Sequence, residues 1–203
     1  TVCLAGCGKE SAADDTDGIR LSGEIEVGVS EGDSTGESED QPEKEESTEP
    51  FTMFFTGDVM MGNGIINRYV NEGVSGVLSD DLIGEMQNAD LCMINQEFPF
   101  GVGGTQAPDK QYTFKADPKY VQALLDMGVD IVSLANNHVL DFGPDVLSQT
   151  FVTLDDAGID YVGAGETIQR AKEWKSYDIG GTSVAVLGAS RVIPVVEWNV
   201  DNA

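Results

Sequence analysis

Residues 130–143 decide the fold of this chain, and they read Asp130-Ile131-Val132-Ser133-Leu134-Ala135-Asn136-Asn137-His138-Val139-Leu140-Asp141-Phe142-Gly143. The first six are mostly apolar and partly β-branched, which is typical of a short buried strand. Polar residues follow at once, and Pro144 then opens a helical pattern that runs to Ala157 and stops at Gly158. A buried strand that leads into a helix is the repeating unit of a parallel sheet.

The same alternation of strand and helix recurs on both sides of this stretch. Short apolar runs predict strands at 52–56, 91–95 and 161–162. Helical patterns are expected at 81–87 and at 118–127, where Asp117 precedes Pro118 as an N-cap. A hairpin is predicted from strands at 175–179 and 183–187, joined through Gly180-Gly181. The sequence therefore predicts the α/β class, with a largely parallel sheet.

Charge divides the chain into two parts. It carries 11 basic and 36 acidic side chains, a formal net charge of −25, which argues against a nucleic-acid partner. Residues 8–50 hold fifteen acidic and three basic side chains, a net charge of −12, and almost no apolar pattern. Such a segment buries too little surface to offset the entropy of ordering, so we expect a disordered acidic tether at 8–50 and a domain at 51–203.

The first seven residues resemble the end of a bacterial lipoprotein signal peptide. Leu4-Ala5-Gly6-Cys7 resembles a lipobox, whose cysteine carries the lipid after cleavage. We therefore expect lipidation at Cys7 and attachment to the outer face of the cytoplasmic membrane. The alternative is that Cys3 and Cys7 are incidental or form a disulfide. Cys92 lies in an apolar run and is expected to be a thiol in the core.

Polar residues follow three of the predicted strands. Asp58 ends the first strand, Glu97 follows the second, and Asn136-Asn137-His138 follows the third. Because the carboxyl ends of parallel strands share one edge of the sheet, these side chains are expected to converge. Carboxylates, an amide and an imidazole suit a hard or borderline divalent metal ion.

Each of these residues also has an ordinary structural interpretation. Asp58 can be a turn residue or a helix cap, and Glu97 can be a solvated loop residue. His138 is the only histidine of the chain and follows a buried strand directly, which favours a role in a site. Asp141 can orient the His138 imidazole or can cap the helix that begins at Pro144, and both alternatives remain open.

Several motifs together resemble one known family. They are Gly57-Asp58-Val59-Met60-Met61-Gly62, Asn95-Gln96-Glu97-Phe98-Pro99, and the segment from Tyr112 to Gly143, with Ser133-Leu134-Ala135-Asn136-Asn137-His138 as its most specific part. They are similar to those of the bacterial capsule-synthesis family CapA, the poly-γ-glutamate biosynthesis proteins. The resemblance covers most of the chain from Phe51 to about Ser190.

The resemblance implies a fold, a site and a cofactor. The fold is the α/β/β/α sandwich of the calcineurin-like metallophosphoesterases. Asp58, Glu97 and Asn137 would bind a divalent metal ion (Mn, Mg, Zn or Fe), and His138 would act as general acid or contact a phosphate. Two departures argue against a full dinuclear centre: Met60 stands where the family pattern has a histidine ligand, and Glu97 stands where it has an aspartate.

No histidine follows His138, although later loops of this fold carry histidines, so we expect residues 51–203 to be the N-terminal part of the domain, incomplete at its C-terminal end. The expected function is capsule biosynthesis by a surface-anchored protein with a metallophosphoesterase-like hydrolase site, and the partner is the capsule polymer or its synthesis complex. The alternative is a lipoprotein that binds or assembles without catalysis. A P-loop motif is absent, and Asp58-Val59-Met60 lacks the second aspartate of a haloacid-dehalogenase-type enzyme.

Overall fold

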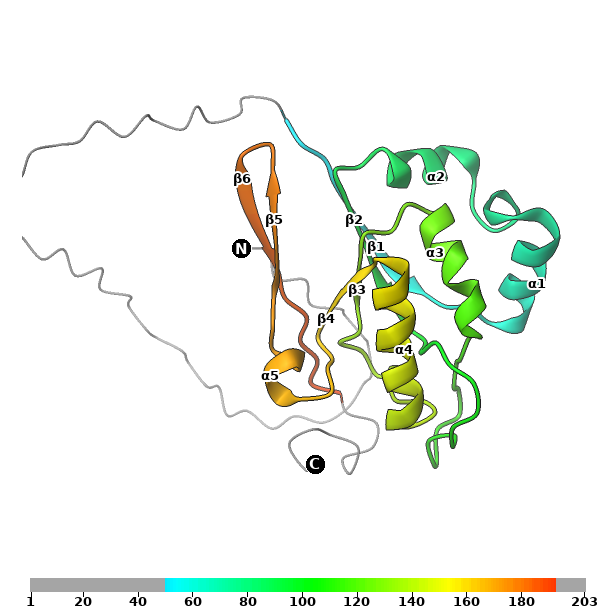
Figure 1. The fold of residues 1–203 in the computed structure, drawn as a ribbon. Coiled ribbons are helices and arrows are strands. Elements are labelled where there is room, and N and C mark those ends of the chain that lie inside the picture. The colour runs from blue at the N-terminus through cyan, green and yellow to red at the C-terminus, as the bar shows by residue number, and fades with distance from the viewer. Residues whose placement is uncertain (1–49, 193–203) are drawn as a thin grey trace, which may run out of the picture. The chain divides into compact units, whose positions relative to one another are not determined.

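The computed structural model describes residues 50–192, and a four-stranded parallel sheet forms their centre (Figure 1). The strands are β1 (Met53–Val59), β2 (Leu91–Gln96), β3 (Ile131–Ser133) and β4 (Asp160–Val162), and they lie in that order across the sheet. All three pairings are parallel. The α/β class and the parallel sheet predicted from the sequence are confirmed.

Most of the helices cover one face of this sheet (Figure 1). The α-helices are α1 (Asn63–Glu72), α2 (Asp80–Gln87), α3 (Gln122–Asp126), α4 (Pro144–Ala157) and α5 (Ile168–Ala171), and the 3₁₀ helices are η1 (Val74–Gly76) and η2 (Pro118–Val121). Met86 of α2, Leu124 of α3 and Leu154 of α4 pack in one core cluster with Ile94 and Val132 of the sheet. The buried Cys92 belongs to this cluster, and burial raises the pKa of its thiol to about 11, as expected for an inert core cysteine.

The opposite face of the sheet packs against a hairpin. Strands β5 (Lys175–Ile179) and β6 (Thr182–Val186) are antiparallel, and Gly180 and Gly181 turn between them with φ values of 58° and 83°. Two positive φ values in a two-residue loop are those of a type I′ turn, as the Gly-Gly pair predicts. The hairpin contributes Ile179 and Val186 to a second cluster, with residues of β2, β3 and β4 that point away from the helices.

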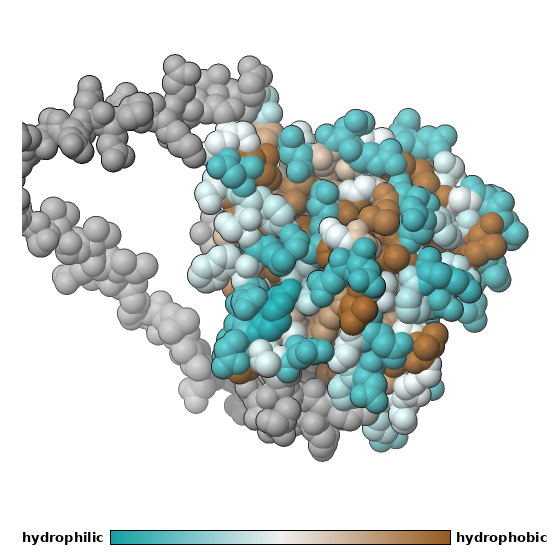
Figure 2. Space-filling view, viewed as in Figure 1, coloured by the Kyte–Doolittle hydropathy of each residue, from teal (hydrophilic) through white to brown (hydrophobic). Residues whose placement is uncertain are grey.

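The segments expected at 1–7 and 8–50 lie outside the described residues except for Pro50, as do residues 193–203. Between residues 50 and 192, no helix has both the length and the apolar composition that crossing a membrane requires. The face seen in Figure 2 is largely hydrophilic, with separate hydrophobic patches between polar side chains. Single exposed apolar residues such as Val70 and Val152 are ordinary for a protein surface.

Candidate functional site

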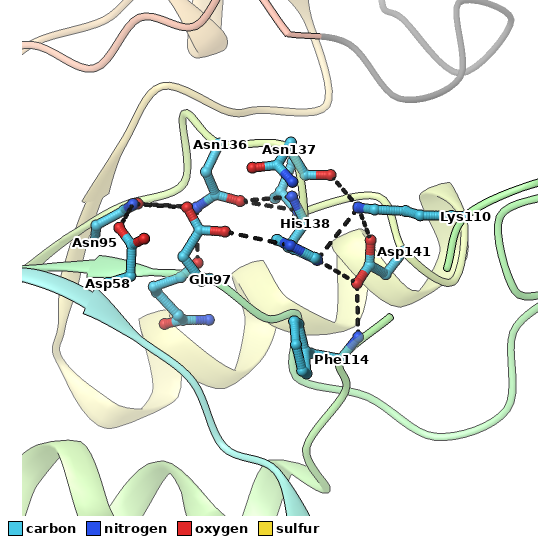
Figure 3. A network of polar contacts seen from close by, with 11 residues as sticks. Asp58, Asn95, Glu97, Lys110, Phe114, Asn136, Asn137, His138 and Asp141 are labelled. Atoms are coloured by element: carbon cyan, nitrogen blue, oxygen red, sulfur yellow. Dashed lines mark hydrogen bonds and ion pairs between the residues drawn. The ribbon is translucent and has the colours of Figure 1, made fainter. Parts of the chain in front are cut away.

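The register of the sheet brings the predicted residues together at one edge. The Cα atoms of Asp58 and Asn95 are partners across β1 and β2, and Asn95 in turn pairs with Ser133 of β3. The β1 pairing shifts between Phe55 and Asp58, so Asp58 lies within the strand near its end, and not after it as the sequence suggested. Glu97 follows β2 directly, and the turn that carries His138 follows β3 (Figure 3).

Asn95 joins the two carboxylates, a role that the sequence analysis did not assign to it. Its Nδ2 donates to Asp58 Oδ1 at 2.8 Å and to Glu97 Oε1 at 2.8 Å. A single amide group therefore holds two acidic side chains side by side (Figure 3). Asn95 follows Ile94 in an apolar strand, so its position alone gives no sign that its side chain reaches two others.

Asn136 orients that amide from the other side. Its Oδ1 accepts hydrogen bonds from the backbone N–H groups of His138 and Val139, each at 3.0 Å. Its Nδ2 must then face the opposite way, and it donates to Asn95 Oδ1 at 3.0 Å. Because Asn95 Oδ1 is used in this way, its Nδ2 is the group left to face the carboxylates. We call Asn136 and Asn95 the amide chain, since the backbone fixes the orientation of both groups.

Asn137, predicted to be the amide ligand, contributes its backbone to this network. Its carbonyl oxygen accepts from Lys110 Nζ at 2.5 Å. Among residues 50–192, no hydrogen bond from the Asn137 side chain is seen, whereas Asn136 is 7% exposed and uses both ends of its amide. Of the two adjacent asparagines, Asn136 is the one whose side chain is hydrogen-bonded to Asn95, which in turn contacts the carboxylates.

His138 lies between the two acidic ends of the site. Its Nδ1 is 2.8 Å from Asp141 Oδ2, and its Nε2 is 3.7 Å from Glu97 Oε2. The Asp141 carboxylate also accepts from Lys110 Nζ and from the Phe114 backbone N–H, so it acts as an acceptor throughout. The ring therefore meets Asp141 through Nδ1, and its Nε2 is directed toward Glu97.

Asp141 thus contacts the imidazole, and the alternative that it caps the following helix is wrong. The N-cap of α4 is Gly143, with a φ of 89° and no side-chain cap. Asp141 is fully buried, with 0% of its surface exposed. A buried carboxylate is costly unless it is paired and hydrogen-bonded, and this one contacts three nitrogen atoms.

Lys110 is a further residue of the site, and the sequence analysis did not predict it. Its Nζ contacts Asn137 O, Asp141 Oδ1 and His138 Nδ1, the last at 3.2 Å. It lies in residues 97–117, which connect β2 to η2 without a helix or a strand of their own. Long irregular connections are often functional, and that length was the one signal available in the sequence.

The site is open at one end and closed at the other. Asp58 is exposed, Glu97 is 7% exposed and Asp141 is fully buried. Burial raises the pKa of Glu97, and the negative charge of Asp58 acts in the same direction; the hydrogen bond from Asn95 and the charges of His138 and Lys110 oppose the shift. A ligand that comes from the Asp58 side would meet Glu97 and His138 Nε2 in turn.

The carboxylates of Asp58 and Glu97 are the charged oxygen donors that this site could offer to a cation. Within residues 50–192, no group of three or more His, Cys, Asp or Glu side chains is arranged to hold a metal ion. Asp58 and Glu97 nevertheless both accept hydrogen bonds from the Asn95 side-chain amide. Mg²⁺ and similar ions are commonly bound by one or two carboxylates, with water and substrate oxygens as the other ligands. His138 Nε2 is the remaining donor nearby.

Comparison with known proteins agrees with the resemblance seen in the motifs. The chain is 33% identical over 153 residues to the capsule biosynthesis protein CapA of Bacillus anthracis, covering 72% of this chain and 36% of that protein. It is 27% identical over 167 residues to the PGA biosynthesis protein CapA of Bacillus subtilis, covering 77% of this chain and 42% of that protein. The chain thus spans well under half the length of these relatives. Residues 52–202 match the family described as "Bacterial capsule synthesis protein PGA_cap", a metallophosphoesterase-like domain, and the chain belongs to this family.

Proposed function

We propose that this protein acts in the biosynthesis of a capsule polymer of the poly-γ-glutamate kind, through a metallophosphoesterase-like site at the edge of its sheet. The names of the Bacillus relatives support the biological process. The observation that carries the chemistry is the convergence of Asp58, Glu97 and the Asp141-held His138 at one strand edge. Such a site suits hydrolysis or transfer at a phosphoryl or acyl group.

Each residue has a defined task in this proposal. Asp58 and Glu97 would hold one divalent ion, which supplies Lewis-acid activation of a phosphoryl or acyl oxygen. Asn95 keeps the two carboxylates together. His138 moves a proton through Nε2, because Nδ1 contacts Asp141, which fixes the plane of the ring. The open Asp58 end admits the ligand.

A second candidate is a site that binds the polymer or an assembly partner without turnover. It is favoured by the small number of acidic ligands, since the described residues offer no three-ligand metal cluster. The same edge would then hold an anionic polymer end or a partner loop. Metal binding and hydrolysis separate the two candidates.

The catalytic proposal predicts that the full-length protein binds Mn²⁺ with a stoichiometry of about one and hydrolyses a generic phosphoester. Asp58→Asn should weaken Mn²⁺ binding at least about tenfold, because a ligand charge is lost. Asp81→Asn, at an exposed position in the first turn of α2, is the matched control and should bind as the wild type does. Isothermal titration calorimetry and a phosphoesterase assay measure both. If the protein neither binds Mn²⁺ nor hydrolyses phosphoesters, the catalytic proposal is wrong and binding without turnover is the candidate that remains.

We also propose that the protein is anchored at the outer face of the cytoplasmic membrane through Cys7. The support is the lipobox-like sequence Leu4-Ala5-Gly6-Cys7 and the acidic stretch that follows it. In the full-length protein, Cys7→Ser should appear in the medium or as unprocessed precursor, whereas Cys3→Ser should stay with the membrane. Cell fractionation and mass measurement test this. Unchanged membrane retention and processing of Cys7→Ser would contradict the anchor.

A further inference from the structure

An apolar cavity of about 290 Å³ lies between β1 and the helices α1, α2 and α3. Its inner wall includes buried side chains of the first core cluster, namely Met61, Met86, Ala123 and Met127. The volume is near the lower end of the range for pockets that bind small molecules. The cavity therefore has room for a small ligand or for part of a larger one.

This cavity reaches solvent beside Asp58. The exposed members of its lining are Asp58, Met60 at 44% and Ile65 at 39%, so these three side chains surround its opening. Asp58 also accepts a hydrogen bond from Asn95, at one end of the polar network in Figure 3. One carboxylate thus borders both the candidate site and the cavity, and a molecule bound at Asp58 can extend into the cavity.

The wall of the cavity offers few partners to a polar ligand group. The hydroxyl of Tyr69 donates to Asp126 Oδ2 at 2.6 Å, and the hydroxyl of Thr56 donates to Gly57 O at 3.0 Å. Apart from these two side chains and Asp58, the lining is apolar among the described residues. Water in such a space makes few hydrogen bonds, so a hydrocarbon group displaces it readily.

Methionines make up much of this lining. Of the six methionines in the chain, Met60, Met61, Met86 and Met127 line the cavity, and we call them the cavity methionines. The methionine side chain is unbranched and has three rotatable bonds, so it adapts its shape to what it packs against. Such a wall suits a flexible aliphatic chain better than a rigid polar ring.

We propose that this cavity is the subsite for an aliphatic chain, which the substrate carries next to its phosphoryl or acyl group. The inference rests on the proposed function, because it names the class of substrate for the same site. The substrate is an amphiphile, with its reacting group at Asp58 and Glu97 and its chain among the cavity methionines. Each methylene group that enters is removed from water, so the affinity should rise about threefold for each one until the cavity is full.

The methionines also provide the test and its internal control. Met53 and Met93 pack against the second cluster, on the opposite face of the sheet. The metal-free full-length protein, labelled with ¹³C at the methionine methyl groups, is titrated with 1-butanol and with 1-octanol. The signals of the cavity methionines should shift and those of Met53 and Met93 should not. Octanol should bind about a hundredfold more tightly than butanol, because it adds four methylene groups.

A larger side chain in the wall should block the chain of the probe. Val77 lines the cavity and is partly exposed, and Val77→Trp should weaken octanol binding at least about tenfold. Val70→Trp is the matched control, since Val70 lies on α1 outside the lining and is 61% exposed. If Val77→Trp does not fold, Ile65→Trp at the opening takes its place.

Three results in these titrations would overturn the inference: no shift of the cavity methionines, equal shifts of all six methionines, or unchanged octanol binding by the folded tryptophan variant. A second assay connects the cavity to the reaction. The value of kcat/KM for octyl phosphate, below the concentration at which it forms micelles, should exceed that for methyl phosphate at least about tenfold. Val77→Trp should lower the value for octyl phosphate more than the value for methyl phosphate.

The two assays separate this inference from the proposed function. Equal kcat/KM values for the two esters would contradict the inference and leave the proposed hydrolysis intact. If octanol shifts the cavity methionines but neither ester is hydrolysed, the proposed hydrolysis is wrong and the cavity stands as a hydrocarbon-binding site. The titration with a neutral alcohol requires neither a metal ion nor turnover.

Discussion

Capsule polymer is expected to fall at least about a hundredfold when His138→Ala replaces the wild-type full-length protein in the organism that makes it. The imidazole is the group that can transfer a proton at the open side of the site, and its Nε2 lies 3.7 Å from Glu97. Alanine removes that group, and because the imidazole also contacts Asp141 and the Phe114 ring, urea unfolding checks that the variant is still folded. Cell-bound polymer is measured against the amount of the protein in the same cells.

Two further variants make this result specific. Gln169→Ala, at an exposed position on α5, is the control and should leave the polymer at wild-type level. His138→Gln keeps a polar side chain of similar reach but cannot transfer a proton at neutral pH. Catalysis predicts that His138→Gln loses polymer as His138→Ala does, whereas simple binding predicts that it keeps much of it. Normal polymer from His138→Ala, at normal protein level, would place the function elsewhere on the molecule.

Asn136→Ala is expected to destabilise the full chain by about 3 kcal/mol, because several buried polar groups lose their partner together. The backbone N–H groups of His138 and Val139 lose their acceptor, and Asn95 Oδ1 and Gln96 O lose their donor. Urea unfolding measures the change. The turn after β3 should loosen and the two carboxylates should separate, so Mn²⁺ binding should weaken as well.

Asn137→Ala is the matched control for this experiment. It removes the same side chain from the next residue, where only the backbone carbonyl takes part in the network. We expect a loss of less than about 1 kcal/mol. Equal losses from the two variants, or a larger loss from Asn137→Ala, would show that the amide chain is not what holds the turn.

The strand and helix pattern was predictable where local signals were strong. The helix from Pro144 to Ala157 and its stop at Gly158 are observed as predicted, since proline at the start and glycine in the left-handed conformation at the end act locally. Helix α1 was missed because its N-cap is Gly62, without a side-chain cap, and its first turn has no acidic residue. A helix without start signals leaves little trace in one sequence.

The sequence predicted where in the fold the site lies, but it did not predict which side chains contact one another there. The carboxyl ends of parallel strands lie at one edge of the sheet, and this rule alone predicted that Asp58, Glu97 and His138 would lie close together. Which of two adjacent asparagines faces inward depends on the turn after β3, and periodicity cannot distinguish neighbours. Lys110 reaches the site from 28 residues away along the chain, so only the folded loop reveals it.

The amide chain also determines when the site acquires its shape. Neutral groups hold the two carboxylates, and their orientation derives from the backbone N–H groups of His138 and Val139. The electrostatic repulsion between the two carboxylates is thus overcome when the protein folds, and ligand binding does not have to overcome it again. A preorganised site of this kind loses little conformational entropy on binding. Asn95 and Asn136 should accordingly keep the same rotamers in the free and the ligand-bound protein.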